Sequence, residues 1–484
     1  MRAALRGTTA FCISILAGST GAQVTWQRTF GAFGTEQGRA IVEAGNGDLL
    51  TCGSTGSFGN GNSDIYVVRV NDAGDHIWSA TFGGPGIEDG NDILALPDGN
   101  FLVVGTTNSF GEGGYDGYVV EFSAAGELLW QHTYGTSDWD LFNAVTRTTD
   151  GGFLFAGLTY GAGHGGADAW VVRTDGAGDL LWQEYYGDAG SDAANSVITV
   201  SSGGFVLAGH IGSNGEQDAW IQKIDDGGGE EWQVVLGGDS LDDFNDVIET
   251  SDLGFVAVGS THSYHDFTEA YHAKVDAFGG FVWDHVWGQV GEQVTNGILE
   301  STSGDLVSIG YTTTAGQGGK DAFILFSDAN GDFMRGVTNG GDGGTNDESG
   351  NDILRCASGG FAFTGYTESF GFGTRDLYLV RTNDTGWTDT PSVDELFDPL
   401  PVRDHGPLAS FEVYPIPSST GEVSIVSAIP PERIEIYDIR GGAVPYRSLG
   451  PLRILIDAPS GTYFIHAFVG AHTALGVQRI QIIH

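Results

Sequence analysis

Tryptophan recurs along this chain at an almost constant spacing, and that spacing constrains the fold more than any other feature. Successive members of the series are 52, 52, 52, 50 and 51 residues apart. The series is Trp26, Trp78, Trp130, Trp182, Trp232 and Trp283. A period of about 50 residues is typical of solenoids and propellers, in which each repeat is one supersecondary unit packed against its neighbours.

Each repeat contains four short segments rich in β-branched and aromatic residues, with turn signals between them. In the repeat that starts at Trp78 the predicted strands are 92–96, 101–106, 117–122 and 128–134. Gly99 and Gly126 mark the first and third turns, where a tight hairpin requires a positive φ. The same turns in every repeat account for most of the 79 glycines among the 484 residues.

A four-strand unit repeated in tandem predicts a β-propeller with one blade per repeat. Seven three-strand blocks are present, but only six of them are followed by a fourth strand, and an extra strand precedes the first block at 24–30. We therefore predict an all-β, seven-bladed propeller over 23–388, closed by its N-terminal strand. An open solenoid is the alternative, but it leaves that first strand unexplained.

The N-terminus is typical of an exported protein. Arg2 and Arg6 precede an apolar stretch at 10–17, and small residues follow up to a predicted cleavage site before Gln23. This pattern predicts a signal peptide at 1–22, since the apolar stretch is too short to span a bilayer. We expect no membrane span elsewhere, and a secreted or outer-membrane surface-attached mature protein.

Charge excludes several classes of partner. The chain has 20 Lys+Arg against 63 Asp+Glu, a formal net charge of −43. Such a chain lacks the basic patch that binds nucleic acid and is repelled by anionic lipid. Hydrophobic residues still make up 40% of the chain, enough to bury a core. Cys52 ends a predicted second strand near one face of the propeller, and Cys356 ends a first strand of the neighbouring blade near the other face. They are too far apart for a disulfide, so we expect both to be unpaired.

Two acidic positions recur in the repeats. One precedes the predicted inner strand in six repeats, with Gln293 in its place in the sixth, and three residues later comes Asn in six repeats and Arg39 in the first. The other opens each third strand: Asp64, Asp116, Asp168, Asp218, Asp321 and Asp376, with Glu269 in the fifth repeat. These carboxylates either form a ring that binds calcium or another cation, or close their own loops by accepting backbone hydrogen bonds. Strict periodicity favours loop closure, and it likewise favours the tryptophans as packing anchors between blades.

Departures from the repeat are the better candidates for a ligand or metal site. The fifth repeat carries His262, His265 and Asp266, side chains that ligate transition metals. The seventh carries an acidic loop, which makes calcium the candidate cofactor although the loop lacks the spacing of an EF-hand. Its candidate ligands are Asp342, Asp347 and Glu348. Trp139 and His164 distinguish the third repeat. No nucleophile elbow, zinc-protease motif or P-loop occurs, so we predict no catalytic residue.

Composition changes after Trp387. The Pro- and acid-rich stretch 389–408 is predicted to be a linker, and the short apolar runs of 409–484 predict a small Ig-like β-sandwich. The segments 411–417 (FEVYPIP), 436–444 (IYDIRGGAV) and 459–465 (PSGTYFI) resemble, in order, the motifs of the C-terminal sorting domain of the Bacteroidetes type IX secretion system. The matching residues are Tyr414, Pro415, Pro417, Asp438, Gly441, Gly461 and Tyr463.

This resemblance implies export by the type IX secretion machinery and then release or attachment at the cell surface. The repeats themselves resemble poorly characterised bacterial propeller repeats, which implies a fold and little about activity. We expect a monomeric binding or adhesion module that takes a glycan or protein ligand at the channel mouth. The alternatives are an extracellular glycan hydrolase or lyase, and a structural component of a surface layer.

Overall fold

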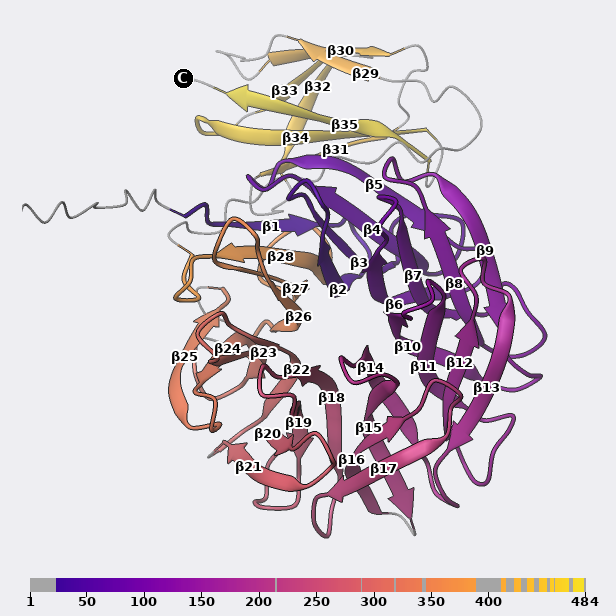
Figure 1. Ribbon diagram of the computed structural model, residues 1–484. Coiled ribbons are helices and arrows are strands. Elements are labelled where there is room, and N and C mark those ends of the chain that lie inside the picture. The colour runs from indigo at the N-terminus through magenta and orange to yellow at the C-terminus, as the bar shows by residue number, and fades with distance from the viewer. Residues whose placement is uncertain are drawn as a thin grey trace, which may run out of the picture.

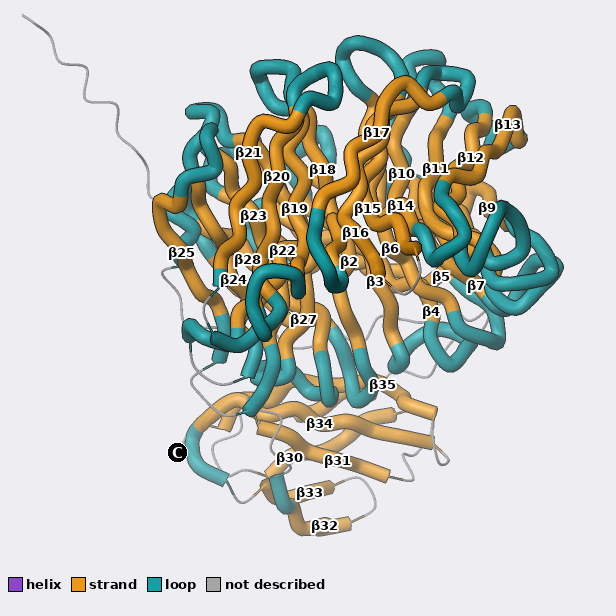
Figure 2. Tube along the Cα trace, turned by 90° about the horizontal axis from the view of Figure 1, so that it is seen from below, coloured by secondary structure: helices purple, strands orange, loops and turns teal. Residues whose placement is uncertain are grey.

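The computed structural model contains strands and loops and no helix in the residues that it describes (Figure 2). These are 23–388 except 214–215, 289, 317–318 and 342–344, followed by 411–414, 422–427, 433–438, 444–450, 453–456, 458–469 and 473–482. The predicted signal peptide and linker lie outside them. None of the described elements is a helix of the length and hydrophobicity that crossing a bilayer takes.

Seven four-stranded antiparallel sheets, here called sheets 1 to 7, follow one another around a central space (Figure 1). Sheets 1 to 3 are β2 (Glu36–Glu43), β3 (Leu49–Thr55), β4 (Asp64–Val70), β5 (His76–Phe82); β6 (Glu88–Ala95), β7 (Phe101–Thr107), β8 (Asp116–Phe122), β9 (Leu128–Tyr134); and β10 (Asp140–Arg147), β11 (Phe153–Thr159), β12 (Asp168–Thr174), β13 (Leu180–Tyr186). Sheets 4 and 5 are β14 (Ala193–Thr199), β15 (Phe205–Ser213), β16 (Glu216–Ile224), β17 (Glu230–Leu236); and β18 (Asp242–Glu249), β19 (Phe255–Thr261), β20 (Glu269–Val275), β21 (Phe281–Trp287). Sheets 6 and 7 are β22 (Gln293–Glu300), β23 (Leu306–Thr312), β24 (Asp321–Ser327), β25 (Phe333–Asn339); and β26 (Glu348–Arg355), β27 (Phe361–Thr367), β28 (Asp376–Thr382), β1 (Trp26–Phe30). The all-β class and the four-stranded antiparallel sheets that the repeat predicts are therefore confirmed.

The first strand of the chain belongs to the last sheet. β1 pairs antiparallel with β28, with Trp26 opposite Arg381 and Phe30 opposite Leu377. On the inner side, each first strand contacts the first strand of the next sheet, and β26 contacts β2. Sheets 7 and 1 are thus neighbours although their sequences are more than 300 residues apart, as the hydrogen bond from the Ile41 backbone to Asp352 at 2.8 Å records.

The core lies between adjacent sheets. β7 and β8 are buried along their whole length, whereas β9 is exposed or half-buried. Leu50 and Val67 of sheet 1 pack with Val103 and Val120 of sheet 2 in one such layer. Strands covered on both faces need continuous apolar runs rather than alternation, which is why the second and third segments of each repeat are so hydrophobic.

The repeated tryptophans pack on the glycine turns of the neighbouring sheet. Gly126 has φ +79°, and a Cβ there would lie 3.1 Å from the Trp78 ring. The same contact joins Trp26 of β1 to Gly74 of sheet 1, and Trp182, Trp232 and Trp283 meet turn glycines in the same way. Trp130 packs on Gly178 and also donates to Glu121 at 2.8 Å. A larger residue at these turns has no room, so one glycine serves both the turn and the packing.

Cys52 and Cys356 are buried and unpaired, which confirms the prediction. Burial raises the pKa of the Cys356 thiol to about 12 and that of Cys52 well above its usual value. Both thiols are therefore protonated and unreactive at neutral pH.

The C-terminal strands form two separate sheets. One is β29 (Phe411–Tyr414), β30 (Glu422–Ser427), β33 (Arg453–Ile456) and β32 (Tyr446–Gly450), and the other is β31 (Arg433–Asp438), β34 (Gly461–Val469) and β35 (Thr473–Ile482). Ile436, Ile454 and Ile465 meet in a shared core, so the two sheets pack face to face.

The described residues of the sorting-domain motifs lie on or next to three different C-terminal strands, β29, β31 and β34. Tyr414 ends β29, Asp438 ends β31, and Gly461 begins β34. Tyr463 is buried, and its hydroxyl donates to the Pro459 carbonyl at 2.8 Å. Pro415, Pro417 and Gly441 lie outside the described residues.

Candidate functional site

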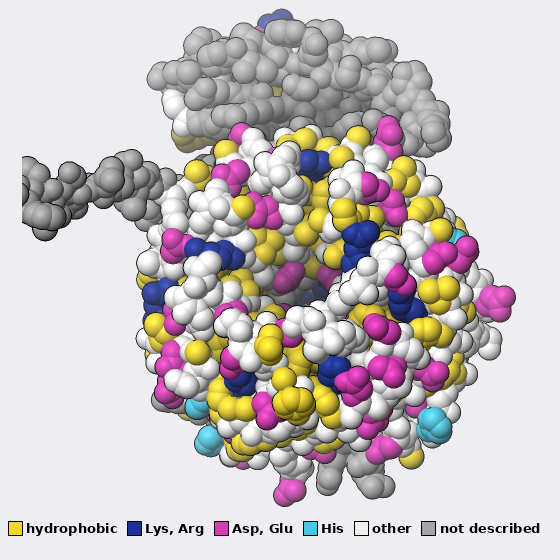
Figure 3. Space-filling view, in the orientation of Figure 1, with side chains coloured by type: hydrophobic (Ala, Val, Ile, Leu, Met, Phe, Trp, Pro, Cys, Tyr) yellow, Lys and Arg dark blue, Asp and Glu magenta, His cyan; other side chains and the backbone are white. Residues whose placement is uncertain are grey.

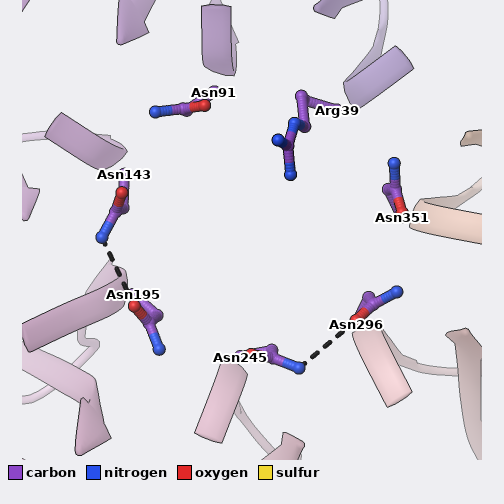
Figure 4. A pocket seen from close by; sticks show the side chains of 7 residues that line it. All are labelled: Arg39, Asn91, Asn143, Asn195, Asn245, Asn296 and Asn351. Atoms are coloured by element: carbon purple, nitrogen blue, oxygen red, sulfur yellow. Dashed lines mark hydrogen bonds between the residues drawn. The ribbon is translucent and has the colours of Figure 1, made fainter. Parts of the chain in front are cut away.

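A β-bulge interrupts every inner strand at the same position. In β6 the register with β7 shifts between Gly90 and Asp92, so Asn91 is the extra residue. The residues at this position in sheets 1 to 7 are Arg39, Asn91, Asn143, Asn195, Asn245, Asn296 and Asn351. A bulge re-aims the side chain that it carries, and here it aims all seven at one cavity of about 230 Å³ (Figure 4).

The asparagines join each inner strand to the next. Every one donates its amide N–H to the backbone carbonyl of the residue that precedes the bulge in the following sheet. Asn91 bonds Phe142 at 2.8 Å, and Asn351 bonds Gly38 at 2.7 Å, which links sheet 7 to sheet 1. Asn143 and Asn245 also reach the amide oxygen of the next asparagine, each at 3.3 Å. This ring of side chains therefore holds the inner ends of the sheets in register.

Arg39 is the exception in the ring. Its side chain is exposed, extends into the space that the seven residues surround, and makes no ion pair with any described residue (Figure 4). With the amide oxygen of Gln37 turned toward it, Nη2 lies 3.1 Å from that oxygen. The guanidinium keeps most of its five donors for other partners.

Three carboxyl groups directly follow the bulge. Asp92, Asp246 and Asp352 accept hydrogen bonds from the next inner strand, Asp92 from the Val145 N–H at 2.8 Å and Asp246 from the Ile298 N–H at 2.9 Å. Burial raises their pKa values to about 7, 6 and 8, and mutual repulsion adds to the shift of Asp352. Figure 3 shows acidic and basic side chains together in the central hollow. The charge there changes with pH across the neutral range.

The recurring loop carboxylates accept hydrogen bonds from their own loops. Asp64 accepts from the Gly61 N–H at 2.9 Å, and Glu88 accepts from the Gly84 N–H at 2.6 Å and from Thr107 at 2.7 Å. Asp116, Asp168 and Asp376 accept from backbone N–H groups in the same way. Asp218 and Asp321 occupy the same position in β16 and β24. Burial raises the pKa of Asp376 to about 7 and also raises the pKa values of Glu36, Asp64 and Asp192.

The histidines of the fifth repeat have separate partners. His262 lies 2.7 Å from the Thr268 hydroxyl, and His265 lies 2.7 Å from a Glu269 oxygen. Asp266 is exposed to solvent. No three His, Cys, Asp or Glu side chains within the described residues come together as a metal site, so the structure does not gather the predicted ligands of this repeat.

The acidic loop of the seventh repeat is engaged in local hydrogen bonds. Asp347 accepts from the Lys320 N–H at 2.9 Å, and Glu348 accepts from Thr367 at 2.9 Å and from the Gly341 N–H at 3.0 Å. Asp342 lies outside the described residues.

The six asparagines of the cavity could be recognised in the sequence as a constant position of the repeat. No sequence pattern predicted the β-bulge that directs their side chains into the cavity.

No protein-family model and no curated protein matches this chain. Solved structures do resemble this chain, at low sequence identity. An ulvan lyase is 9% identical with a TM-score of 0.49 over 74% of this chain and 95% of its own. PorZ, a surface component of the type IX secretion system of Porphyromonas gingivalis, is 12% identical with a TM-score of 0.37 over 91% and 64%.

A periplasmic gluconolactonase of Pseudomonas aeruginosa is 13% identical with a TM-score of 0.42, over 69% of this chain and 97% of its own. Identities this low concern the fold alone. What this chain binds therefore has to be argued from its own residues.

Proposed function

We propose that residues 23–388 form a seven-bladed β-propeller that the N-terminal strand closes. The pairing of β1 with β28 and the contact between β26 and β2 support this proposal. We further propose that 1–22 is a signal peptide and that 409–484 is an Ig-like sorting domain read by the type IX secretion machinery. The protein would then be secreted or displayed at the cell surface.

For the propeller we propose a binding role, with the ligand entering the channel mouth. One observation carries the proposal: Arg39 occupies a position where six repeats have an asparagine that joins neighbouring sheets. A purely structural ring would keep asparagine in all seven repeats. An arginine without an ion pair among the described residues is unexpected in a chain with 63 acidic residues.

The chemistry of the ring defines the ligand class. A guanidinium binds a carboxylate through two parallel hydrogen bonds, and the surrounding asparagine amides suit hydroxyl groups. The cavity is smaller than the ~300 Å³ at which pockets for drug-sized ligands begin, so it fits one sugar residue. The net charge of −43 repels a polyanion. A glycan ending in a single uronic acid satisfies these conditions.

A glycan array probed with the mature full chain, with and without calcium, tests this role. We expect binding to uronate-ended glycans and its loss in Arg39→Asn, which makes the ring uniform without removing a sheet contact. Arg147→Asn, at the exposed end of β10, is the matched control for lost charge. Binding to no glycan, or equal binding by Arg39→Asn and the native chain, contradicts the proposal.

The export proposal has a separate test. Removing 409–484 should leave the propeller in the periplasm of a type IX-competent host, whereas the full chain reaches the medium or the cell surface. Equal export of both chains would show that these residues are not the address.

A further inference from the structure

Three aromatic side chains meet at the boundary between sheets 2 and 3. The rings of Tyr115 and Trp139 have centroids 5.3 Å apart and planes at 77°, and those of Trp139 and Tyr160 are 6.3 Å apart at 84°. We call these three residues the aromatic corner, because Trp139 stands nearly perpendicular to both tyrosines.

The backbone holds this corner in place. Tyr115 and Trp139 form an isolated parallel β-bridge between the two sheets. The Asp140 N–H donates to the Tyr115 carbonyl, and the Tyr160 N–H donates to the Trp139 carbonyl, both at 2.8 Å. A Cβ on Gly114 would lie 2.5 Å from the indole nitrogen, so the loop leaves room for Trp139 only because glycine is there. The three rings are therefore positioned before any ligand arrives.

The repeat does not require aromatic residues here. The equivalent positions at the boundary of sheets 1 and 2 are Ser63, Ile87 and Asn108, and at that of sheets 4 and 5 they are Gln217, Leu241 and His262. Trp139 remains 52% exposed and Tyr160 49% exposed. Leu241 is also 49% exposed, but tyrosine and tryptophan occur at these positions only at the boundary of sheets 2 and 3 among the three boundaries compared. Exposed large aromatic groups that the repeat does not require are candidates for an interaction site.

Charge decides what the corner binds. Glu112 and Asp138, on the two loops that carry the corner, are exposed, and no Lys or Arg occurs between residues 101 and 146. Aromatic faces carry negative electrostatic potential and attract cations, and the carboxylates add to that potential. Anions and acidic lipids are repelled by the same groups.

Shape separates the remaining ligands. A sugar ring stacks best on a broad flat aromatic surface, but Trp139 meets the two tyrosines edge to face, at 77° and 84°, so the three rings form no such surface. A compact cation needs only one exposed ring face, which Trp139 offers. We propose that the aromatic corner of Tyr115, Trp139 and Tyr160 binds an organic cation, with a quaternary ammonium group as the best fit. None of these three residues lines the cavity of Arg39 and the six asparagines, so this proposal can be tested separately from the proposed glycan site.

A matched pair of probes isolates the charge. Choline carries a quaternary ammonium, and 3,3-dimethylbutan-1-ol has the same shape without the charge. In ligand-observed NMR with the mature full chain, we expect saturation transfer to the choline methyl groups and little to the neutral analogue. Trp139→Leu should weaken choline binding about ten-fold, the size of a partly desolvated cation–π contact. Trp139→Phe should retain part of it.

Trp387→Leu is the control variant, because Trp387 is 55% exposed and lies in the turn after β28, away from the corner. It should leave choline binding unchanged. Raising the salt concentration should weaken binding by screening the carboxylates. Equal binding of choline and the alcohol, or no loss in Trp139→Leu, overturns the proposal. Loss of glycan-array binding in Trp139→Leu without any choline binding would overturn it in favour of a sugar site.

Discussion

The sheets contact their neighbours at both their inner and their outer edges, through residues that recur from repeat to repeat. At each edge one repeat has a different residue, and only at the outer edge does another side chain replace the lost contact. At the outer edge the sixth repeat has Met334 in place of tryptophan, and Phe326 packs against Gly386 instead. At the inner edge the first repeat has Arg39 in place of asparagine, and none of the described residues supplies the missing amide.

The difference separates structural variation from functional variation. An apolar contact can be replaced by any side chain of suitable volume, and Arg335 even covers Phe326 with its guanidinium 3.7 Å from the ring centroid. A directional hydrogen bond has no such substitute. Arg39, whose missing asparagine hydrogen bond no described residue replaces, is therefore a better candidate for ligand binding than Met334.

Deleting residues 23–30 should have the largest effect. The deletion removes Trp26, whose burial is worth about 3–5 kcal/mol, and exposes the edge of β28, which is buried along its whole length. We expect a large fall in melting temperature and oligomers on size-exclusion chromatography. Moving the same residues to follow residue 388 should restore a monomer. A truncated chain that stays monomeric and equally stable would show that the outer contact between sheets 7 and 1 is dispensable.

A pair of glycine substitutions tests how much the packing of tryptophan on the turn glycine adds to stability at the outer edge. Gly126 and Gly99 both have positive φ, but only Gly126 faces a tryptophan, and a Cβ at Gly99 meets nothing within 4 Å. Gly99→Ala should cost about 1 kcal/mol from backbone strain alone. Gly126→Ala should cost about 2–3 kcal/mol, since the methyl group also displaces Trp78. Chemical denaturation measures both losses of unfolding free energy. Equal losses would show that Gly126 has no packing role beyond its turn conformation.

The inner carboxyl groups predict a pH dependence. Asp92, Asp246 and Asp352 have folded-state pKa values of about 7, 6 and 8, above the usual value near 3.8. The folded protein therefore binds more protons than the unfolded chain, so stability should fall as pH rises from about 4 to about 8. Thermal unfolding across that range measures it. Asp352→Asn should flatten the upper part of the profile, and an unchanged profile would contradict the assignment.

The smallest effects belong to the ring itself. Asn245→Ala removes the bond to the Thr295 carbonyl at 2.9 Å and should cost about 1 kcal/mol. Arg39→Asn supplies a seventh amide and should change stability by no more than about 0.5 kcal/mol in either direction. Denaturation midpoints compare the two variants. A loss in Arg39→Asn as large as that in Asn245→Ala would make Arg39 a structural residue.

The repeat predicted strand positions closely where strands are apolar. In sheet 2 the predicted strand 128–134 matches β9, and 101–106 differs from β7 by one residue. The prediction 92–96 missed the first four residues of β6, because Glu88 is a buried carboxylate and Asn91 is a bulge, and neither follows the alternation of a strand.

The proposed sites also combine features that the sequence determines with features that only the tertiary structure decides. The sequence alone determined the four-stranded repeat, the unpaired cysteines and the constant Asn or Arg position, because each depends on spacing along the chain. Only the tertiary structure brought seven positions from seven sheets to one cavity, and joined Trp139 to Tyr115 and Tyr160, which lie 24 and 21 residues away in the sequence. Periodicity fixes what recurs within a repeat, whereas a ligand site depends on side chains from different repeats, and their approach is set by how the sheets pack.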